Sequence, residues 1–446
     1  MLTREDDTVS VTVIGGGLAG CEAAWQLAKR GIPVVLYEMK PTRKTPAQQL
    51  DTLAELVCSN SLRSDRLTNA VGLLKAEMRK LDSLIMRAAD ATAVPAGGAL
   101  AVDRNGFSAE IDRSIRQHPL ITLREEEVTE IPSEGTVVIA SGPLTSDALS
   151  DAIARMDGMS TLHFYDAAAP IVTADSLDMD KVFCLSRYDR GADYLNCPMD
   201  RDTYMNFVHE LQNAETVPVR GFEEKSVFEG CMPIESMAKR GDMAIAFGPM
   251  KPVGLKDPRT GKEPFAVVQL RRDNFAGTLY NIVGFQTRLT FPEQRRVFGM
   301  IPGLENAEFA RLGVMHRNTF LNSPGFLDET FRVINQPRIY FAGQITGVEG
   351  YVESAASGLL VGITLAYREK GMEPPHFNGK TAIGAMGRYV STPNKRFQPM
   401  NCAFGLIDPL DVKPGGKRIR NKQQRYEKIS ERALEELDAI IGQLEQ

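Results

Sequence analysis

The sequence has no apolar run of transmembrane length, and its N-terminus, MLTREDDT, lacks the apolar core of a signal peptide. We therefore expect a cytoplasmic protein with no membrane partner. The chain has six cysteines in 446 residues, and they form no C-x-x-C pair. Cysteines scattered in this way argue against a disulfide framework and a structural zinc site. The five histidines show no metal-ligand spacing, so we predict no metal.

The composition is that of an ordinary soluble globular protein, with 43% hydrophobic and 24% charged residues. The length allows two domains, or one domain with a large insertion. A net charge of −5 argues against general affinity for nucleic acid but leaves room for a local basic patch.

The most informative motif is VTVIGGGLAG near the N-terminus, which lies between a predicted strand at 9–14 and a predicted helix at 21–30. A second predicted strand at 34–37 ends at Glu38. Strand, glycine turn, helix, strand and carboxylate together form the context that makes a G-x-G-x-x-G motif specific for a dinucleotide.

Each glycine of this motif has a separate task. Gly15 permits the tight turn, Gly17 lets the backbone approach a pyrophosphate, and Gly20 lets helix and strand pack closely. The helix N-terminus offers free N–H groups and partial positive charge to the phosphates. Glu38 lies where a carboxylate can accept hydrogen bonds from a ribose diol.

The rest of the chain indicates a discontinuous domain. Residues 70–90 have the spacing of one amphipathic helix, and 136–140 that of a buried strand ending in a Ser-Gly-Pro turn. The parent sheet resumes at 338–341 and is followed by a second glycine-rich turn, AGQITGVEG, and a helix at 351–369. A last amphipathic helix is predicted at 426–444.

The middle of the chain differs in composition. It is richer in Met, Pro and Asn and contains short strand-like runs at 267–270 and 279–283. We predict an α/β protein in which 1–160 and 330–446 form a Rossmann-like FAD-binding domain and 161–329 an inserted α+β domain. The bipartite pattern favours FAD over NAD. No second G-x-G-x-x-G stands between a strand and a helix, so a nicotinamide cofactor has no Rossmann half of its own.

Two cysteines are candidates for chemistry. Cys58 lies in ELVCSNSLR, where polar residues and arginines could lower the pKa of a thiol, and a catalytic and a structural role are about equally supported. Cys231 lies in FEGCMPIE, between Glu229 and Glu235, which could exchange protons. Its local sequence alone favours a packed loop cysteine. His316 is the most suggestive histidine, although a hydrogen-bonded imidazole explains it equally well.

Two basic segments could attract phosphates, although solvated charge is the ordinary reading of such runs. The first flanks Cys58, and the second precedes the C-terminal helix. Their members are Arg63, Arg66, Lys75, Arg79 and Lys80 in the first, and Lys413, Lys417, Arg418, Arg420, Lys422, Arg425 and Lys428 in the second.

Several segments together resemble the folate- and FAD-dependent tRNA (uracil-5-)-methyltransferases. They include TPAQQLDTLAELVCSNSLRSD, PAGGALAVDR, FEGCMPIE, NIVGFQTRLTFPEQ, MHRNTFLNSP and AGQITGVEGYVESAASGL. These segments span nearly the whole chain. Related wobble-uridine flavoenzymes share the glycine turns but not the CSNSL and EGCMP segments together.

The resemblance implies a reaction. The methylene of 5,10-methylenetetrahydrofolate would go to C5 of uridine 54 in the tRNA T-loop. Reduced FAD would supply the reducing equivalents, and NAD(P)H would reduce the flavin between turnovers. Cys58 would be the nucleophile that adds to uracil C6, and Cys231 the base. The reverse assignment of the two cysteines stays open.

The resemblance also implies the binding residues. Lys75 and Arg79 are candidate contacts near the flavin or the RNA. The adenosine-diphosphate end of FAD is assigned to Gly15, Gly16, Gly17, Leu18, Ala19, Gly20 and Glu38, and the flavin and folate to Gly343, Gln344, Gly350 and Tyr351. One departure concerns Gln48 and Gln49, which stand where the family commonly has two histidines. Glutamine keeps hydrogen bonds but exchanges no proton near neutral pH.

Three alternatives remain at this stage. The same chemistry could act on a uridine of ribosomal RNA. The chain could instead be a flavin oxidoreductase for a small molecule with the cysteines as a redox pair, or a noncatalytic flavin-bound RNA-binding protein.

Overall fold

A parallel sheet with strand order β16-β7-β1-β2-β6 forms the centre of the larger part of the chain. The computed structural model describes residues 10–45, 47–156, 161–187, 191–217, 232–313, 315–394, 397–410 and 419–444. Apart from β6 at the edge, the strands are short, apolar and largely buried, as parallel strands usually are. Their bounds are β1 (Val11–Ile14), β2 (Val34–Tyr37), β6 (Ile121–Arg124), β7 (Val137–Ile139) and β16 (Ile339–Phe341).

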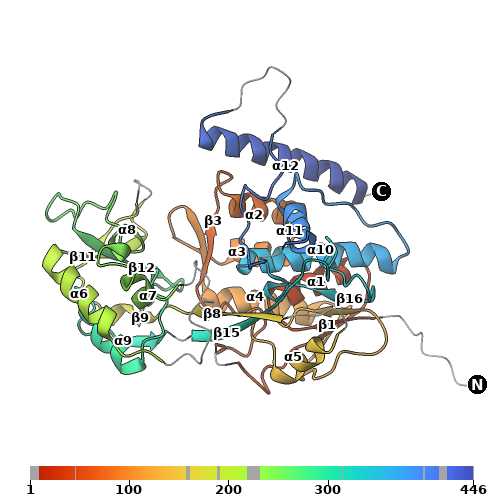
Figure 1. Ribbon diagram of the computed structural model, residues 1–446, viewed down its shortest axis with the longest axis horizontal. Coiled ribbons are helices and arrows are strands. Elements are labelled where there is room, and N and C mark those ends of the chain that lie inside the picture. The colour runs from red at the N-terminus through yellow and green to blue at the C-terminus, as the bar shows by residue number, and fades with distance from the viewer. Residues whose placement is uncertain are drawn as a thin grey trace, which may run out of the picture.

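The pairing of β16 with β7 closes the discontinuous sheet, although residues 140–338 intervene between the two strands. It brings α1 (Leu18–Lys29) and α10 (Tyr351–Glu369) side by side on the sheet (Figure 1). The small residues expected at 355–358 are buried in this contact. A Cβ on Gly358 would lie 2.1 Å from the carbonyl oxygen of Ala19, so only glycine lets the two helices approach this closely.

The prediction of one helix over 70–90 is wrong. The chain forms α2 (Ala70–Lys80) and α3 (Leu84–Ala91) instead. Asp82 adopts a left-handed conformation with φ of 55°, and the hydroxyl of Ser83 accepts a hydrogen bond that caps α3. The apolar spacing continues through this turn because both helices bury the same side, and the spacing therefore hides the break.

Further helices complete the first core. The predicted C-terminal helix is confirmed and begins at Lys422, four residues before the expected start. It lies along α2, at the top of Figure 1 and separated from α5 by the rest of this core. The remaining bounds are α4 (Arg104–Gln117), α5 (Asp147–Ala154), α11 (Ala382–Ser391) and α12 (Lys422–Leu444).

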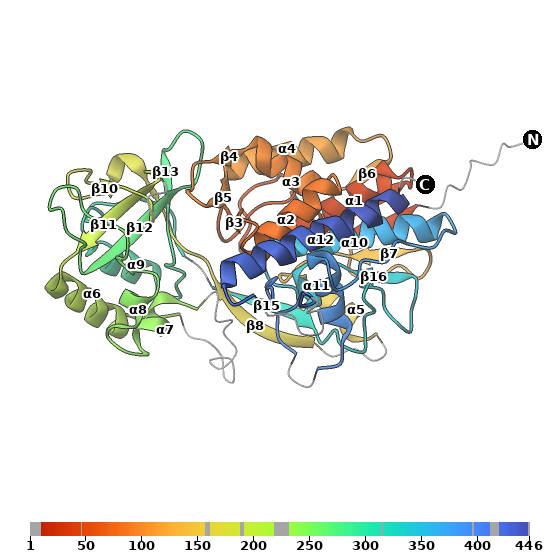
Figure 2. The ribbon, with the colours of Figure 1, turned by 90° about the horizontal axis from the view of Figure 1, so that it is seen from above.

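A second hydrophobic core is built from residues 172–304. Its antiparallel sheet has the order β10-β11-β12-β13-β9-β14, and the pairs that flank β11, β12 and β13 confirm the strands expected near 267 and 279. Figure 2 shows this core beside the first. The bounds are β9 (Ile171–Thr173), β10 (Phe183–Cys184), β11 (Tyr194–Met199), β12 (Ala266–Arg272), β13 (Leu279–Ile282), β14 (Phe309–Arg311), α6 (Arg201–Asn213), α7 (Ile234–Ala238), α8 (Ala244–Phe247) and α9 (Phe291–Phe298).

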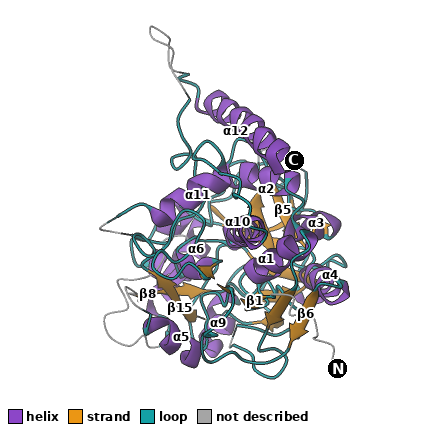
Figure 3. Cartoon of the chain, turned by 90° about the vertical axis from the view of Figure 1, so that its right-hand side faces the viewer, coloured by secondary structure: helices purple, strands orange, loops and turns teal. Residues whose placement is uncertain are grey.

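Two long antiparallel strands, β8 (Thr161–Ala167) and β15 (Met315–Leu321), run between the two cores. A small sheet of β3 (Ser61–Ser64), β5 (Ala99–Val102) and β4 (Ala93–Val94) extends from the first core toward the second. The end-on view in Figure 3 shows helices packed around the parallel sheet. The predicted α/β class with a Rossmann-like FAD-binding fold is confirmed, whereas the domain boundaries at 160 and 330 stay predictions. Among the described helices, none has the length and apolar content that crossing a membrane requires.

Candidate active site

The glycine turn between β1 and α1 has open space at one position only. A Cβ on Gly17 would meet nothing within 4 Å, whereas one on Gly15 would lie 2.5 Å from the oxygen of Ala140. A Cβ on Gly20 would lie 1.8 Å from the oxygen of Gly15. Helix α1 also begins without a side-chain cap. Its first N–H groups therefore face the open space at Gly17, which suits a pyrophosphate.

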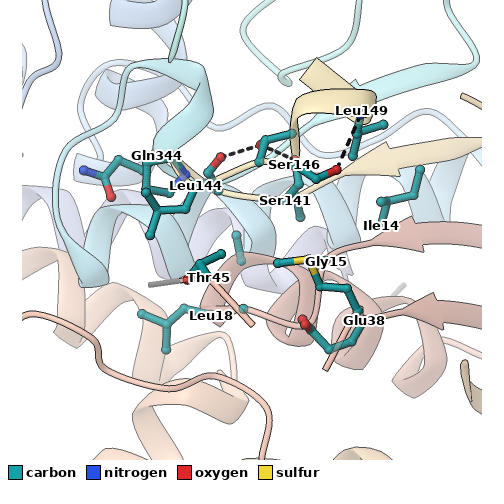
Figure 4. Close-up of a pocket in the computed structure, with 18 of the residues that line it drawn as sticks. Ile14, Gly15, Leu18, Glu38, Thr45, Ser141, Leu144, Ser146, Leu149 and Gln344 are labelled. Atoms are coloured by element: carbon teal, nitrogen blue, oxygen red, sulfur yellow. Dashed lines mark hydrogen bonds between the residues drawn. The ribbon is translucent and has the colours of Figure 1, made fainter. Parts of the chain in front are cut away.

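A cleft of about 1060 Å³ opens above this turn. Figure 4 shows its walls, with Gly15 and Glu38 on one side and Ser141, Ser146 and Gln344 on the other. Eight of the predicted cofactor residues line the cleft, and Gly16, Gly20 and Gly350 lie behind it. The eight are Gly15, Gly17, Leu18, Ala19, Glu38, Gly343, Gln344 and Tyr351.

Glu38 is fixed by backbone donors. The N–H of Gly16 donates to Oε2 at 2.8 Å, and the N–H of Lys40 donates to Oε1 at 3.0 Å. The residue is only 7% exposed, yet it lines the cleft. Because a carboxylate offers about four lone-pair sites, acceptor capacity remains for a ribose diol. A Cβ at position 16 would lie 2.9 Å from Glu38 Oε2, so this contact requires glycine.

The second glycine-rich turn meets the first. Gly343 has φ of 86°, and a Cβ there would lie 3.0 Å from the Cβ of Ala19. The side chain of Gln344 donates to Glu349 at 2.7 Å, which sets its orientation in the cleft wall. Gly350 has φ of 110° at the start of α10. The two turns, far apart in sequence, thus meet at the cleft.

Cys58 lies beside the cleft, and Tyr351, which lines the cleft, contacts the backbone of Cys58. The N–H of Cys58 donates to the phenolic oxygen of Tyr351 at 2.6 Å, and the N–H of Ser59 donates to the same oxygen at 3.2 Å. A second link comes from the same first turn of α10, where the fully buried carboxylate of Glu353 pairs with Arg63. Burial raises the pKa of Tyr351 well above its usual range, and negative charge on Cys58 adds to the shift.

Two buried guanidinium groups act on Cys58. Burial alone lowers the pKa of Arg104, but its contact with Asp273 at 2.8 Å outweighs burial and leaves the pKa raised. Burial and the neighbouring Arg104 lower the pKa of Arg311, while Cys58 acts on it in the opposite direction. Two buried guanidinium groups therefore act on the Cys58 segment, and one of them, Arg104, shares its charge with Asp273.

The second core contacts and supports the Cys58 segment through strand β12. Asn60 is fully buried and donates to the carbonyl of Arg272 at 2.8 Å, while Arg271 donates to the side chain of Asn60 at 3.1 Å. Arg271 also donates to the hydroxyl of Ser59 at 2.8 Å. The segment that carries Cys58 is thus held between the first helix turn of α10 and the strand β12.

The comparisons with known proteins agree on one family. A family model described as glucose inhibited division protein A matches residues 10–373. A methylenetetrahydrofolate–tRNA-(uracil-5-)-methyltransferase TrmFO from Geobacter sulfurreducens is 61% identical over 434 residues, which cover 97% of this chain and 98% of that protein. The TrmFO of Lactobacillus johnsonii is 59% identical over 433 residues with the same coverage. This chain belongs to the TrmFO family of methyltransferases.

The fold has a solved relative as well. Aquifex aeolicus GidA, in its form II crystal, superposes with a TM-score of 0.69 at 18% identity, covering 99% of this chain and 77% of the other. At this identity the likeness concerns the fold alone. It agrees with the Rossmann-like architecture that positions the cleft.

The other residues with predicted chemical roles lie partly outside and partly within the described part of the chain. Cys231 and Glu229 lie outside the described residues, as do the side chains of His163 and His316. Glu235 is buried, and its carboxylate accepts hydrogen bonds from Thr287 and from the N–H of Arg288, each at 2.9 Å. Burial raises its pKa, and both oxygens are used to tie the first turn of α7 to residues 287–288. Among the described residues no three His, Cys, Asp or Glu side chains gather closely enough to hold a metal.

The first basic segment differs from expectation. Lys75 is fully buried and donates to the carbonyls of Leu62 and Ser64 at 2.8 Å each, so the idea that it contacts flavin or RNA is wrong. Arg79 pairs with Asp65 and Asp90. These cations stabilise strand β3 and its surroundings instead of presenting charge to a ligand.

The second basic segment keeps exposed charge at the start of α12. Lys422 and Arg425 are exposed, and neither pairs with a carboxylate of the described residues. Both lie 5.6 Å from the ring of Tyr426, which stacks on Phe404 at 4.1 Å. Lys413, Lys417 and Arg418 lie outside the described residues.

Gln48 and Gln49 hold the loop before Cys58. The side chain of Gln48 accepts a hydrogen bond from the N–H of Thr45 at 2.9 Å, and the N–H of Gln49 donates to Glu55 at 2.9 Å. Sequence reasoning missed Arg104, Arg271 and Asp273, because their partners are remote in sequence. Their only local signal was an unusual density of charge next to apolar strands.

Proposed function

We propose that this chain methylates C5 of uridine 54 in the T-loop of tRNA, with 5,10-methylenetetrahydrofolate as carbon donor. The observation that carries the proposal is the position of Tyr351. It lines the cleft that suits a dinucleotide, and it accepts the hydrogen bond from the backbone of Cys58. A nucleophile segment and a cofactor cleft that meet at one side chain are what this reaction needs. The names of the TrmFO relatives support the folate and tRNA substrates.

In the proposed reaction the Cys58 thiolate adds to C6 of the uracil ring. This addition makes an enolate and turns C5 into a nucleophile. C5 then bonds to the methylene carbon, and the bond from that carbon to the folate nitrogen breaks. Arg104 and Arg311 favour the thiolate by their positive charge. Ser59 and Asn60, anchored by Arg271, keep the segment in place.

After transfer, C5 must lose its proton to a base. We assign this step to Cys231 on the resemblance of FEGCMPIE, because Glu235 is already engaged with Thr287 and Arg288. Loss of the C5 proton and reduction of the methylene to methyl release the Cys58 thiolate. Restored in this way, it can serve a new turnover.

The cleft would hold FAD, with Gly15, Gly17 and Glu38 at the adenosine-diphosphate end and Gly343 and Gln344 toward the flavin. Bound FAD, kept reduced by NAD(P)H, supplies the reducing equivalents that convert methylene to methyl. Tyr351 and the second glycine turn would orient the ring beside Cys58 and restrict water there.

The test uses an unmodified tRNA transcript, purified protein, FAD, NADPH and 5,10-methylenetetrahydrofolate. The RNA is digested and analysed for 5-methyluridine by mass spectrometry, with mapping of the modified position. We expect product at position 54 that depends on folate and disappears with Cys58→Ala. Product on ribosomal RNA alone would mean that ribosomal RNA, and not tRNA, is the substrate. No product on either RNA, with NADPH oxidised and a disulfide formed, would favour a small-molecule oxidoreductase.

A further inference from the structure

The most exposed large hydrophobic side chain among the described residues is Phe247, which is 79% exposed at the end of α8. Met243 is 37% exposed one helical turn earlier, and the N–H of Phe247 donates to its carbonyl. The opposite side of α8, formed by Ile245 and Ala246, is buried in the second core. Phe247 and Met243 thus form a small exposed apolar surface on an otherwise anchored helix.

The helix is fixed firmly enough to present this ring. The buried hydroxyl of Tyr204 donates to the carbonyl of Asp242 at 2.7 Å and accepts from the N–H of Ala246 at 3.2 Å. Both bonds hold α8 to α6. Because the backbone directly before Phe247 is tied to a buried residue, ordering the ring against a ligand costs little conformational entropy.

The surroundings of Phe247 are cationic. Residues 239–256 carry four Lys or Arg side chains and one carboxylate, Asp242. Lys239 and Lys256 are exposed, and Lys251 is half-buried. None of these three lysines pairs with a carboxylate of the described chain. An outward aromatic ring among cations complements a single-stranded nucleic acid, whose bases stack and whose phosphates attract charge.

The second core also lines a cavity next to the strand that follows the nucleophile segment. The carbonyl of Lys251 accepts a hydrogen bond from Arg187 at 2.6 Å. Arg187 lines a second cavity, of about 740 Å³, together with Ser64 and Gln269. Ser64 ends the strand β3 that follows directly on the segment of Cys58. The cavity thus lies between the two cores, with Tyr194 and Gln269 of the second core on one side and Ser64 of the strand that follows the Cys58 segment on the other.

We propose that Phe247 is a stacking platform for an unpaired base of the RNA substrate, with Lys239, Lys251 and Lys256 holding the adjoining phosphates. The proposal rests on the RNA substrate of the proposed function. An enzyme that acts on a loop uridine must take that base out of its stack. A neighbouring base then loses its own partner, and Phe247 would replace it.

The experiment measures binding of a fluorescein-labelled tRNA transcript to the full-length, FAD-loaded protein by anisotropy. We expect Phe247→Ala to bind about tenfold more weakly, as is typical when one base loses its aromatic partner, and Phe247→Trp to bind like the wild type. Phe291→Ala is the matched control, because Phe291 is 49% exposed on α9 and should leave affinity unchanged. Phe247→Ala should raise KM for tRNA more than it lowers kcat.

Unchanged affinity in Phe247→Ala would overturn the proposal. So would an equal loss of affinity for a blunt RNA duplex and for a hairpin with the T-loop sequence, because a duplex offers no unpaired base. A change in sedimentation without a change in RNA affinity would assign the ring to contact between copies of the chain. The binding assay requires no turnover, so its outcome is separate from a failure to find 5-methyluridine.

Discussion

The phenolic oxygen of Tyr351 accepts hydrogen bonds from the backbone N–H groups of Cys58 and Ser59, at 2.6 and 3.2 Å. Tyr351 is the first residue of α10 and lines the cleft expected to hold FAD. The contact spans 293 residues of sequence. A group that touches the cofactor space can therefore set the position of the nucleophile, since both depend on one side chain.

Tyr351→Phe removes the acceptor and leaves two N–H groups without a partner. We expect kcat for methyl transfer to fall about tenfold or more, because an unsatisfied buried donor costs about 1–3 kcal/mol. FAD content, read from flavin absorbance, should not change, because the ring remains. Tyr389→Phe is the control, since its hydroxyl bonds to the carbonyl of Gln398. Equal activity of Tyr351→Phe and wild type would show that the hydrogen bond does not position Cys58.

A pair of glycine variants separates cofactor binding from folding. A Cβ on Gly17 meets nothing within 4 Å, whereas one on Gly20 meets the oxygen of Gly15 at 1.8 Å. Gly17→Ala should keep the melting temperature of the flavin-free protein but weaken FAD binding by tenfold or more, because the methyl group fills the space for the pyrophosphate. Gly20→Ala should lower the melting temperature of the flavin-free protein. Calorimetry and flavin fluorescence titration measure the two effects, and normal FAD affinity in Gly17→Ala would place the pyrophosphate elsewhere.

The sequence was sufficient to predict the parts of the fold that rest on local signals. The glycine turn, the apolar strands and the helix at 351–369 each carry their pattern within a few residues. The break at Asp82 escaped prediction because a left-handed Asp leaves no mark on hydrophobic spacing.

The site was predictable only in its glycine-rich half. Tyr351 was predicted as a binding residue, but not its contact with Cys58, and Arg104 and Arg271 come from separate elements that meet the Cys58 segment only in the folded chain. Lys75 shows the same limit in reverse. Its charge suggested a ligand contact, but its helix face is buried and its ammonium group donates hydrogen bonds to backbone carbonyls.

The buried carboxyl of Glu77 should make stability depend on pH. It accepts hydrogen bonds from the N–H groups of Ala382 and Ile383, at 2.7 and 2.9 Å, but burial dominates and raises its pKa to about 8. Because the unfolded group ionises near 4.5 and the folded one near 8, the contribution of Glu77 is greatest below pH 4.5 and is lost as pH rises toward 8. The loss is at most about 1.4 kcal/mol per pH unit.

Glu77→Gln removes this titration. The difference in unfolding free energy between wild type and Glu77→Gln, followed by urea denaturation from pH 5 to 9, should shift steadily in favour of the variant up to about pH 8. Glu435→Gln, an exposed carboxylate on α12, should show no such trend. Parallel stability curves for wild type and Glu77→Gln would mean that Glu77 is ionised in the folded protein.

The start of α12 should contribute to RNA affinity through charge. Arg425 and Lys422 are exposed beside the stacked rings of Tyr426 and Phe404, so phosphates can approach them. Arg425→Glu should weaken tRNA binding several-fold and reduce the slope of log affinity against log salt by about 1. Arg155→Glu makes the same charge change at the C-terminal end of α5, a helix on the other side of the first core from α12 (Figure 1), and should alter neither quantity. If both variants weaken binding equally, net charge and not the α12 surface determines the affinity, and the RNA must lie elsewhere.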